Sequence, residues 1–290
     1  MAPKVDERIL RLFDEYTHAP QSRRVFLERL TSLAGGTAAA AAVLALLDSD
    51  YAHAAVAADD ARIVASRVSY PAPGGTIGGY LVLPKDAPPR RGGVVVVHEN
   101  RGLTPHIEDV ARRTALAGFN ALAVDLLAPH GGTPPDEDKG RELFAAKVDR
   151  GRAWQDVAPA VSLLAARDEG NGKVGAMGFC FGGGVVNDLA VNVPALAAGV
   201  VFYGRAPSPA DAARIRAAML LHYAGNDPGI NAGMAGYEAA LKAAGVRHEQ
   251  HVYAGAQHAF HNDTSAARYD KAAAELAWSR TVAFLRRELA

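Results

Sequence analysis

Residues 178–183 read Gly-Phe-Cys-Phe-Gly-Gly, and this stretch decides how the rest of the 290-residue chain is interpreted. It follows a short apolar run, 174–177, that is typical of a buried strand, and it precedes a helical pattern over 184–191. Glycines two residues before and after Cys180 allow a sharp strand-to-helix turn from which the cysteine side chain projects. The pattern predicts a reactive thiol on a strained turn. The alternative is a small buried cysteine at a glycine-rich junction.

The helix expected after Cys180 would aim its N-terminal amides and the positive end of its dipole at the thiol. Such a setting favours the thiolate and stabilises negative charge on a bound carbonyl oxygen. The amide of Phe181, directly after the cysteine, is therefore a predicted oxyanion-hole donor. Cys180 is the one cysteine of the chain, which excludes an intramolecular disulfide and a cysteine-clustered zinc site.

Outward from this turn, short β-rich runs alternate with helical patterns from about residue 62 to the C-terminus. The alternation predicts an α/β fold, with a mostly parallel central sheet of about eight strands and helices on both faces. Residues 62–70 and 76–83 flank a Pro/Gly-rich turn and are expected to form an antiparallel edge hairpin. The remaining expected strands cover residues 94–97, 120–126, 173–179, 200–203, 219–223 and 248–253. Residues 129–140 are expected to form a loop beside the site, and Pro159 leaves one helix boundary open.

Two further residues follow late strands, at the edge where the carboxyl ends of parallel strands meet. Asp227 comes after the seventh expected strand and His258 after the eighth. A nucleophile, an acid and a histidine in this chain order are typical of a catalytic triad. Taken singly, Asp227 could form an Asx turn and His258 could be a solvated loop histidine. A metal site made of His258, His261 and Asp263 is a further alternative.

With these residues in place, the chain resembles the dienelactone hydrolase family (carboxymethylenebutenolidases) from about residue 62 to residue 289. Residues 172–183 are the most specific part of the resemblance. It implies an α/β-hydrolase fold and hydrolysis of an ester or lactone, with Cys180 as nucleophile and Asp227 and His258 as its partners. It implies no metal and no organic cofactor, and a small-molecule ester or lactone as the binding partner.

Residues 98–103, His-Glu-Asn-Arg-Gly-Leu, are similar to a family loop whose glutamate helps to activate the thiol when substrate arrives. The resemblance puts Glu99 in that role and gives the amide of Asn100 the second place in the oxyanion hole. The position of Glu99 points to the same role without the resemblance. A carboxylate at the end of an all-valine strand is partly desolvated, so it could accept a thiol proton. An ordinary strand-end glutamate in solvent is the alternative.

The sequence departs from the family where dienelactone enzymes hold the substrate carboxylate with two arginines. One of these lies four residues after the catalytic histidine, where this chain has Asn262. The other precedes the strand-to-helix turn at Cys180, called the elbow below, and Lys139 and Arg141 are loose candidates for it. Arg101 could supply a replacement cation or could be a surface charge. The candidate walls of the substrate pocket are Phe179, Phe181, Tyr203 and Phe260.

Residues 1–57 differ in character from the catalytic domain expected over 58–290. A twin-arginine motif begins at Ser22, an alanine-rich apolar run covers 33–47, and small-x-small patterns end at Ala54 and Ala57. This order resembles a twin-arginine export signal. It predicts a periplasmic or secreted protein that meets the membrane only during export.

The alternative is a cytoplasmic protein that keeps the N-terminal segment as a helical extension. Ile9, Leu10 and Phe13 recur at helical spacing, which suits a helix that packs against a partner subunit in a homodimer. The acidic residues around them are also unusual ahead of an export motif.

Composition narrows the function classes further. Lysine plus arginine and aspartate plus glutamate number 31 each, so there is no electrostatic reason to expect a nucleic-acid partner. A second class stays open, a non-catalytic binding or thiol redox-sensing protein on the hydrolase scaffold, because a free thiol is open to oxidation. A complete catalytic triad argues against this alternative, since a non-catalytic binding protein does not need all three residues.

Overall fold

An eight-stranded sheet forms the centre of the computed structural model, which describes residues 5–18, 21–47, 55–85 and 90–290. The strand order is β1-β2-β4-β3-β5-β6-β7-β8, and only the pairings of β2 with β1 and with β4 are antiparallel. The strands are β1 (Ile63–Ala72), β2 (Gly75–Pro84), β3 (Arg91–Val97), β4 (Asn120–Asp125), β5 (Gly170–Phe179), β6 (Ala198–Phe202), β7 (Ala218–Asn226) and β8 (His248–Gln257). The mostly parallel sheet and its edge hairpin are confirmed.

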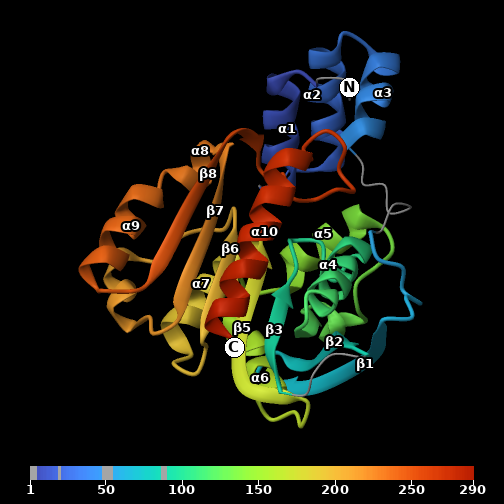
Figure 1. Ribbon diagram of the computed structural model, residues 1–290. Coiled ribbons are helices and arrows are strands. Elements are labelled where there is room, and N and C mark those ends of the chain that lie inside the picture. Colours follow the sequence, from blue (N-terminus) through green and yellow to red (C-terminus); the bar gives the residue numbers. More distant parts are fainter. Residues whose placement is uncertain (1–4, 19–20, 48–54, 86–89) are drawn as a thin grey trace.

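Helices cover both faces of this sheet (Figure 1). Those of the expected catalytic domain, residues 58–290 (called the catalytic part below), are α4 (Pro105–Leu116), α5 (Glu137–Lys147), α6 (Ala153–Ala165), α7 (Phe181–Asn192), α8 (Pro228–Asn231), α9 (Met234–Ala243) and α10 (Lys271–Glu288). Val94 and Val96 of β3 belong to the core shared with α4 and α10, whereas Val95 and Val97 belong to the core shared with α6 and α7. The all-valine run is fully buried because successive side chains enter opposite cores.

One expectation about helix boundaries needs revision, and one boundary that the sequence left open is now defined. The predicted loop over 129–140 is wrong at its end, because α5 begins at Glu137. The side chain of Asp136 accepts a hydrogen bond from the amide of Lys139 at 2.9 Å and so caps this helix. The helix over 153–165 continues through Pro159, since its apolar face packs against β3 and β5 on either side of the proline.

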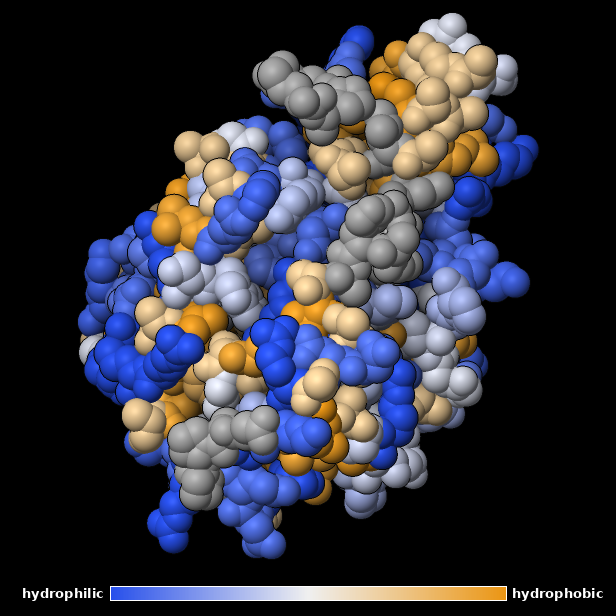
Figure 2. Space-filling view, turned by 45° about the vertical axis from the view of Figure 1, so that its right-hand side comes forward, coloured by the Kyte–Doolittle hydropathy of each residue, from blue (hydrophilic) through white to orange (hydrophobic). Residues whose placement is uncertain are grey.

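Three N-terminal helices form a small unit at the upper edge of the sheet (Figure 1), namely α1 (Glu7–His18), α2 (Arg23–Ala34) and α3 (Thr37–Leu47). Ile9, Leu10 and Phe13 are buried in its apolar core, as their helical spacing indicates. Ala267, in the loop before α10, also packs against this core, so the unit contacts the catalytic part of its own chain. The surface of α3 is largely apolar (Figure 2). Among the described residues, no helix has the length and apolar character needed to cross a membrane.

The chain reaches the sheet through Ala55 and Val56. Their amides bond to the Asp109 carboxylate, at 3.2 and 2.8 Å, and Val56 packs into the core beside Ile63. The expected domain boundary at residue 57 thus falls directly after this anchor. The small-x-small pattern that ends at Ala54 lies outside the described residues.

Candidate active site

Cys180 lies at the junction of β5 and α7 in a strained backbone conformation. Its φ is 54° and its ψ is −115°, a combination that L-residues rarely adopt. A Cβ atom on Gly182 would overlap the carbonyl oxygen of Val97, and one on Gly178 would overlap that of Gly182. The glycines are therefore required for close backbone approach, and the elbow predicted from residues 178–183 is present.

Asp227 and His258 meet on the loops that follow β7 and β8. The Nδ1 atom of His258 lies 2.5 Å from Oδ2 of Asp227, and both side chains are buried. Because a carboxylate only accepts, Nδ1 must be the donor, and Nε2 is the nitrogen that can take up a proton. The other oxygen of Asp227 accepts from the amide of Ile230 at 3.3 Å, which fixes the carboxylate at the start of α8.

The thiol and the imidazole come together in one cavity. Cys180 and His258 both line a space of about 190 Å³ at the carboxyl ends of the strands. Asn100 and Phe181, the two predicted oxyanion donors, line it as well. Phe181 is the first residue of α7, where a backbone N–H has no acceptor within its own helix. The rest of the wall is made by Arg150, Gly184, Val185, Asp188, Arg205 and Ile230.

Glu99 lines a separate space of about 10 Å³ together with Cys180 and His258. Its Oε2 atom accepts a hydrogen bond from the side chain of Asn262 at 3.1 Å. The Oδ1 atom of Asn262 accepts from the amide and hydroxyl of Thr264, so the orientation of the Asn262 amide is fixed. The asparagine at the family's arginine position thus holds the Glu99 carboxylate.

His98 is a site residue that sequence reasoning missed. Its Nε2 atom accepts from the amide of Leu126 at 3.2 Å, and its Nδ1–H donates to the Glu99 carbonyl at 2.5 Å. Complete burial lowers the pKa of His98 and keeps the ring neutral. The side chain links the ends of β3 and β4 and fixes the loop that carries Glu99 and Asn100.

Arg101 is buried, so its reading as a surface charge is wrong. Its Nη1 atom forms an ion pair with Glu137 at 2.9 Å, and it lines the small space beside Glu99. Burial, with a further contribution from Arg268, lowers the pKa of Arg101 to about 10. Of the two loose candidates for a carboxylate-binding cation, Lys139 is exposed and Arg141 is buried against α1.

The predicted aromatic walls are only partly present. Phe181 lines the cavity, but Phe179, Tyr203 and Phe260 are fully buried and do not. Tyr203 packs against the His258 ring with the ring centroids 5.0 Å apart, and Phe260 packs against Tyr203. These three rings support the site from behind, because β5, β6 and the loop after β8 turn them into the core.

The proposed metal set is not brought together. His261 packs against Phe179, whereas Asp263 pairs with His106 at 3.0 Å and with Arg113. The part of the chain that the structure describes holds no group of three His, Cys, Asp or Glu side chains suited to a metal ion.

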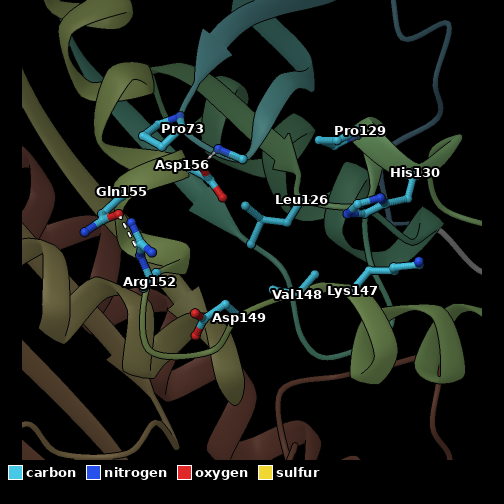
Figure 3. Close-up of a pocket in the computed structure, with 11 residues that line it drawn as sticks. Pro73, Leu126, Pro129, His130, Lys147, Val148, Asp149, Arg152, Gln155 and Asp156 are labelled. Carbon is cyan, nitrogen blue, oxygen red and sulfur yellow. Dashed lines mark hydrogen bonds between the residues drawn. The ribbon is translucent and has the colours of Figure 1, made fainter.

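A second cavity, of about 270 Å³, lies beside the β1–β2 turn and contains none of the predicted site residues (Figure 3). Its lining is mainly polar, with His130, Lys147, Asp149, Arg152 and Asp156 around it. The Asp156 carboxylate accepts from the amide of Gly74 and so joins α6 to the hairpin. This cavity holds no thiol or hydroxyl nucleophile, whereas the smaller one holds Cys180.

Comparison with known proteins agrees with this geometry. The sequence matches the dienelactone hydrolase family over residues 77–289. It is 32% identical over 257 residues to a Saccharolobus solfataricus protein named "Putative carboxymethylenebutenolidase", covering 76% of this chain and 97% of that protein. It is 33% identical over 211 residues to a Bradyrhizobium protein named "Probable 2-oxo-3-(5-oxofuran-2-ylidene)propanoate lactonase", covering 67% and 82%.

Solved structures give the same assignment. A dienelactone hydrolase-like promiscuous phosphotriesterase from metagenomic libraries superimposes with a TM-score of 0.70 at 26% identity, over 79% of this chain and 100% of that chain. A Pyrobaculum calidifontis esterase, 16% identical, shares the fold with a TM-score of 0.59 over 99% of this chain and 100% of that chain. The chain therefore belongs to the dienelactone hydrolase family and is a hydrolase with the α/β-hydrolase fold.

Proposed function

We propose that this hydrolase cleaves a small ester or lactone by covalent catalysis, with Cys180 as nucleophile, His258 as base and Asp227 as the orienting acid. One observation carries the proposal: Cys180, on a strained turn, and His258, held by Asp227, line the same 190 Å³ cavity. The Bradyrhizobium relative is named a lactonase, which supports a lactone among the substrates to be tested.

In the proposed reaction the Cys180 thiolate adds to the acyl carbonyl, and the amides of Phe181 and Asn100 stabilise the oxyanion. The C–O bond to the leaving alcohol breaks, and that oxygen takes a proton from the His258 imidazolium. His258 then removes a proton from water, whose oxygen attacks the thioester and releases the acid and the thiol. Glu99 lines the small space beside the sulfur together with His258, and we propose that it takes the thiol proton first when substrate arrives and passes it to His258, which becomes the imidazolium.

A substrate panel on three proteins tests this assignment. Wild type, Cys180→Ala and Cys180→Ser are assayed with activated esters and lactones, each with and without a carboxylate. We expect Cys180→Ala to abolish turnover while its thermal unfolding stays close to wild type, because only the sulfur is lost. Full activity of Cys180→Ala would refute the assignment of Cys180 as the nucleophile. Reversible peroxide oxidation of Cys180 in a protein that turns over no ester would favour the redox-sensing alternative.

The carboxylate series addresses the departure at residue 262. We propose that dienelactone itself is a poor substrate, because Asn262 holds Glu99 and offers no cation. Equal kcat/KM for matched substrates with and without a carboxylate is the expected result. A strong preference for the carboxylate would instead assign substrate binding to a buried arginine such as Arg101.

We also propose export through the twin-arginine motif, with retention of the N-terminal helices in a cytoplasmic homodimer as the alternative. N-terminal sequencing of secreted material distinguishes the two. A new terminus after Ala54 or Ala57 is expected, and an intact Met1 or Ala2 terminus would contradict export.

A further inference from the structure

The C-terminal end of α1 lies at the proposed nucleophile. Thr17 is buried and lines the small space beside Cys180, Glu99 and His258. With about 10 Å³, this space holds no more than one water molecule, in contrast to the 190 Å³ of the larger cavity that Cys180 also lines. The side-chain amide of Asn100 donates to the Thr17 carbonyl at 2.5 Å, so α1 also contacts the loop that carries the oxyanion donor.

Two aromatic residues of α1 cover buried arginines of the catalytic part. The Phe13 ring lies under the guanidinium groups of Arg268, at 4.9 Å, and Arg101, at 6.0 Å. The Tyr16 ring lies under Arg141 at 4.1 Å. Both rings are almost completely buried, and stacking of this kind is attractive because the ring face is negative. Arg101 and Arg268 also line the space next to the thiol, so Phe13 packs on two of its lining residues, whereas Tyr16 packs on Arg141, which does not line it.

Polar contacts at Asp138 of α5 hold the same helices in place. The Tyr16 hydroxyl donates to Asp138 at 2.6 Å and accepts from Arg141 at 2.8 Å. Arg23, the first arginine of the twin pair, forms an ion pair with Asp138. The side chain of Arg24 is 83% exposed, and its ion-pair partner is Glu28 on the same helix, at 3.7 Å. The two adjacent arginines therefore differ in their contacts.

We propose that, in the chain that keeps residues 1–57, α1 is a wall of the catalytic pocket, and that Phe13 and Tyr16 are specificity-determining residues which limit the size of the group that reaches Cys180. Cleavage after Ala54 or Ala57 on export would remove this wall. The proposal rests on the proposed function in so far as the group is an acyl or alcohol group of the substrate. In this proposal substrate enters through the larger cavity, whose wall includes Arg205 and Ile230. The side covered by α1 admits nothing larger than water.

Access to the thiol can be measured without any assumption about catalysis. Cys180 is the sole cysteine, so its alkylation rate reports this one position. The full-length chain and its Phe13→Ala/Tyr16→Ala variant are treated with N-ethylmaleimide and with the bulkier N-pyrenylmaleimide, and the ratio of the two rates cancels changes in thiol reactivity. We expect the variant to raise the relative rate of the bulky reagent about tenfold, because the wall opens more readily. An unchanged ratio in a folded variant overturns the proposal.

The arginine pair supplies the matched control and the second test. Arg23→Gln removes the ion pair to Asp138, and we expect it to shift the same ratio in the same direction by about two- to fivefold, as loss of a half-exposed ion pair allows. Arg24→Gln should leave the ratio at the wild-type value. If circular dichroism shows the double variant to be unfolded, Arg23→Gln takes its place, and a wild-type ratio there overturns the proposal.

Ester turnover separates this proposal from the proposed function. We expect the double variant to raise kcat/KM for p-nitrophenyl octanoate relative to the acetate, in parallel with the alkylation ratio. A shifted alkylation ratio in a chain that hydrolyses no ester would retain the wall and refute the hydrolytic role of Cys180. Ester hydrolysis by the double variant with an unshifted acyl preference and an unshifted alkylation ratio would refute the wall and retain the hydrolytic role of Cys180.

Discussion

Backbone strain is concentrated at single residues of the proposed site. Cys180, Tyr203 and Ala259 have φ values of 54°, 39° and 65°, and among the described non-glycine residues only Arg90 joins them with a positive φ. Each of the three follows the end of a strand, β5, β6 or β8, and Ala259 is next to His258. Such conformations persist only where the surrounding structure imposes them, as it does at functional sites.

Asp227→Asn tests the role of the acid at this scale. The asparagine keeps the size of the side chain and an oxygen that can cap α8. Its NH₂ group then faces Nδ1 of His258 and, being a donor itself, cannot hold that nitrogen in the protonated form that catalysis requires. We expect kcat to fall about 10³–10⁴-fold with little change in thermal stability. Ester hydrolysis and a thermal melt are the two measurements, and a fall of less than tenfold would contradict an orienting role.

The sequence predicted Cys180, Asp227 and His258 because each follows a strand in an informative order. It could not predict the partners of Glu99. Asn262 reaches Glu99 across 163 residues of chain, and the bonds of His98 to Leu126 depend on how β3 and β4 pair. No local pattern carries such long-range contacts.

At the scale of elements, the β5–α7 junction makes a sharp prediction about two glycines of one helix. A methyl group on Gly182 would overlap the carbonyl oxygen of Val97, whereas one on Gly184 would make ordinary contact with Arg205. We expect Gly182→Ala to lower the free energy of unfolding by about 1–3 kcal/mol or more. Gly184→Ala should leave it unchanged or raise it by about 0.5–1 kcal/mol, since alanine favours the helix.

Urea unfolding of both variants measures this difference. Equal stabilities would show that the close approach of α7 to β3 does not constrain the elbow. The junction itself was predictable from glycine spacing. The start of α5 at Glu137 was missed, because the Pro/Gly-rich residues before it resemble a loop and the cap at Asp136 was not weighed against them.

Across the whole molecule, buried histidines couple folding to pH. Burial lowers the pKa of His98, His222 and His261 below the usual 6.5, so these rings stay neutral in the folded protein. The unfolded chain takes up protons there below about pH 6.5, and the free energy of unfolding therefore falls as the pH drops through that value. Each ring contributes a loss of about 1.4 kcal/mol per pH unit.

Urea unfolding between pH 7.5 and 5.5 measures this slope. His261→Gln should reduce the slope by the share of one ring, because the glutamine does not titrate. A slope that is the same in wild type and His261→Gln would contradict a neutral buried ring at position 261.

The N-terminal helices show where sequence reasoning stops at this scale. The spacing of Ile9, Leu10 and Phe13 predicted an apolar helix face, and the three side chains are buried. The sequence could not show that this helix packs against its own catalytic part, because its anchors are arginines 101, 141 and 268, which lie far along the chain. Export remains a prediction from the twin-arginine motif.

Mass spectrometry of a trapped intermediate tests the central claim most directly. His258→Gln is mixed with p-nitrophenyl acetate and quenched in acid, because loss of the base should slow release of the acyl group from sulfur more than its transfer. We predict a single acetyl group on the peptide that contains Cys180, and none there when Cys180→Ala is treated in the same way. In His258→Gln, an acetyl group on another residue together with an unmodified Cys180 thiol would contradict catalysis by Cys180.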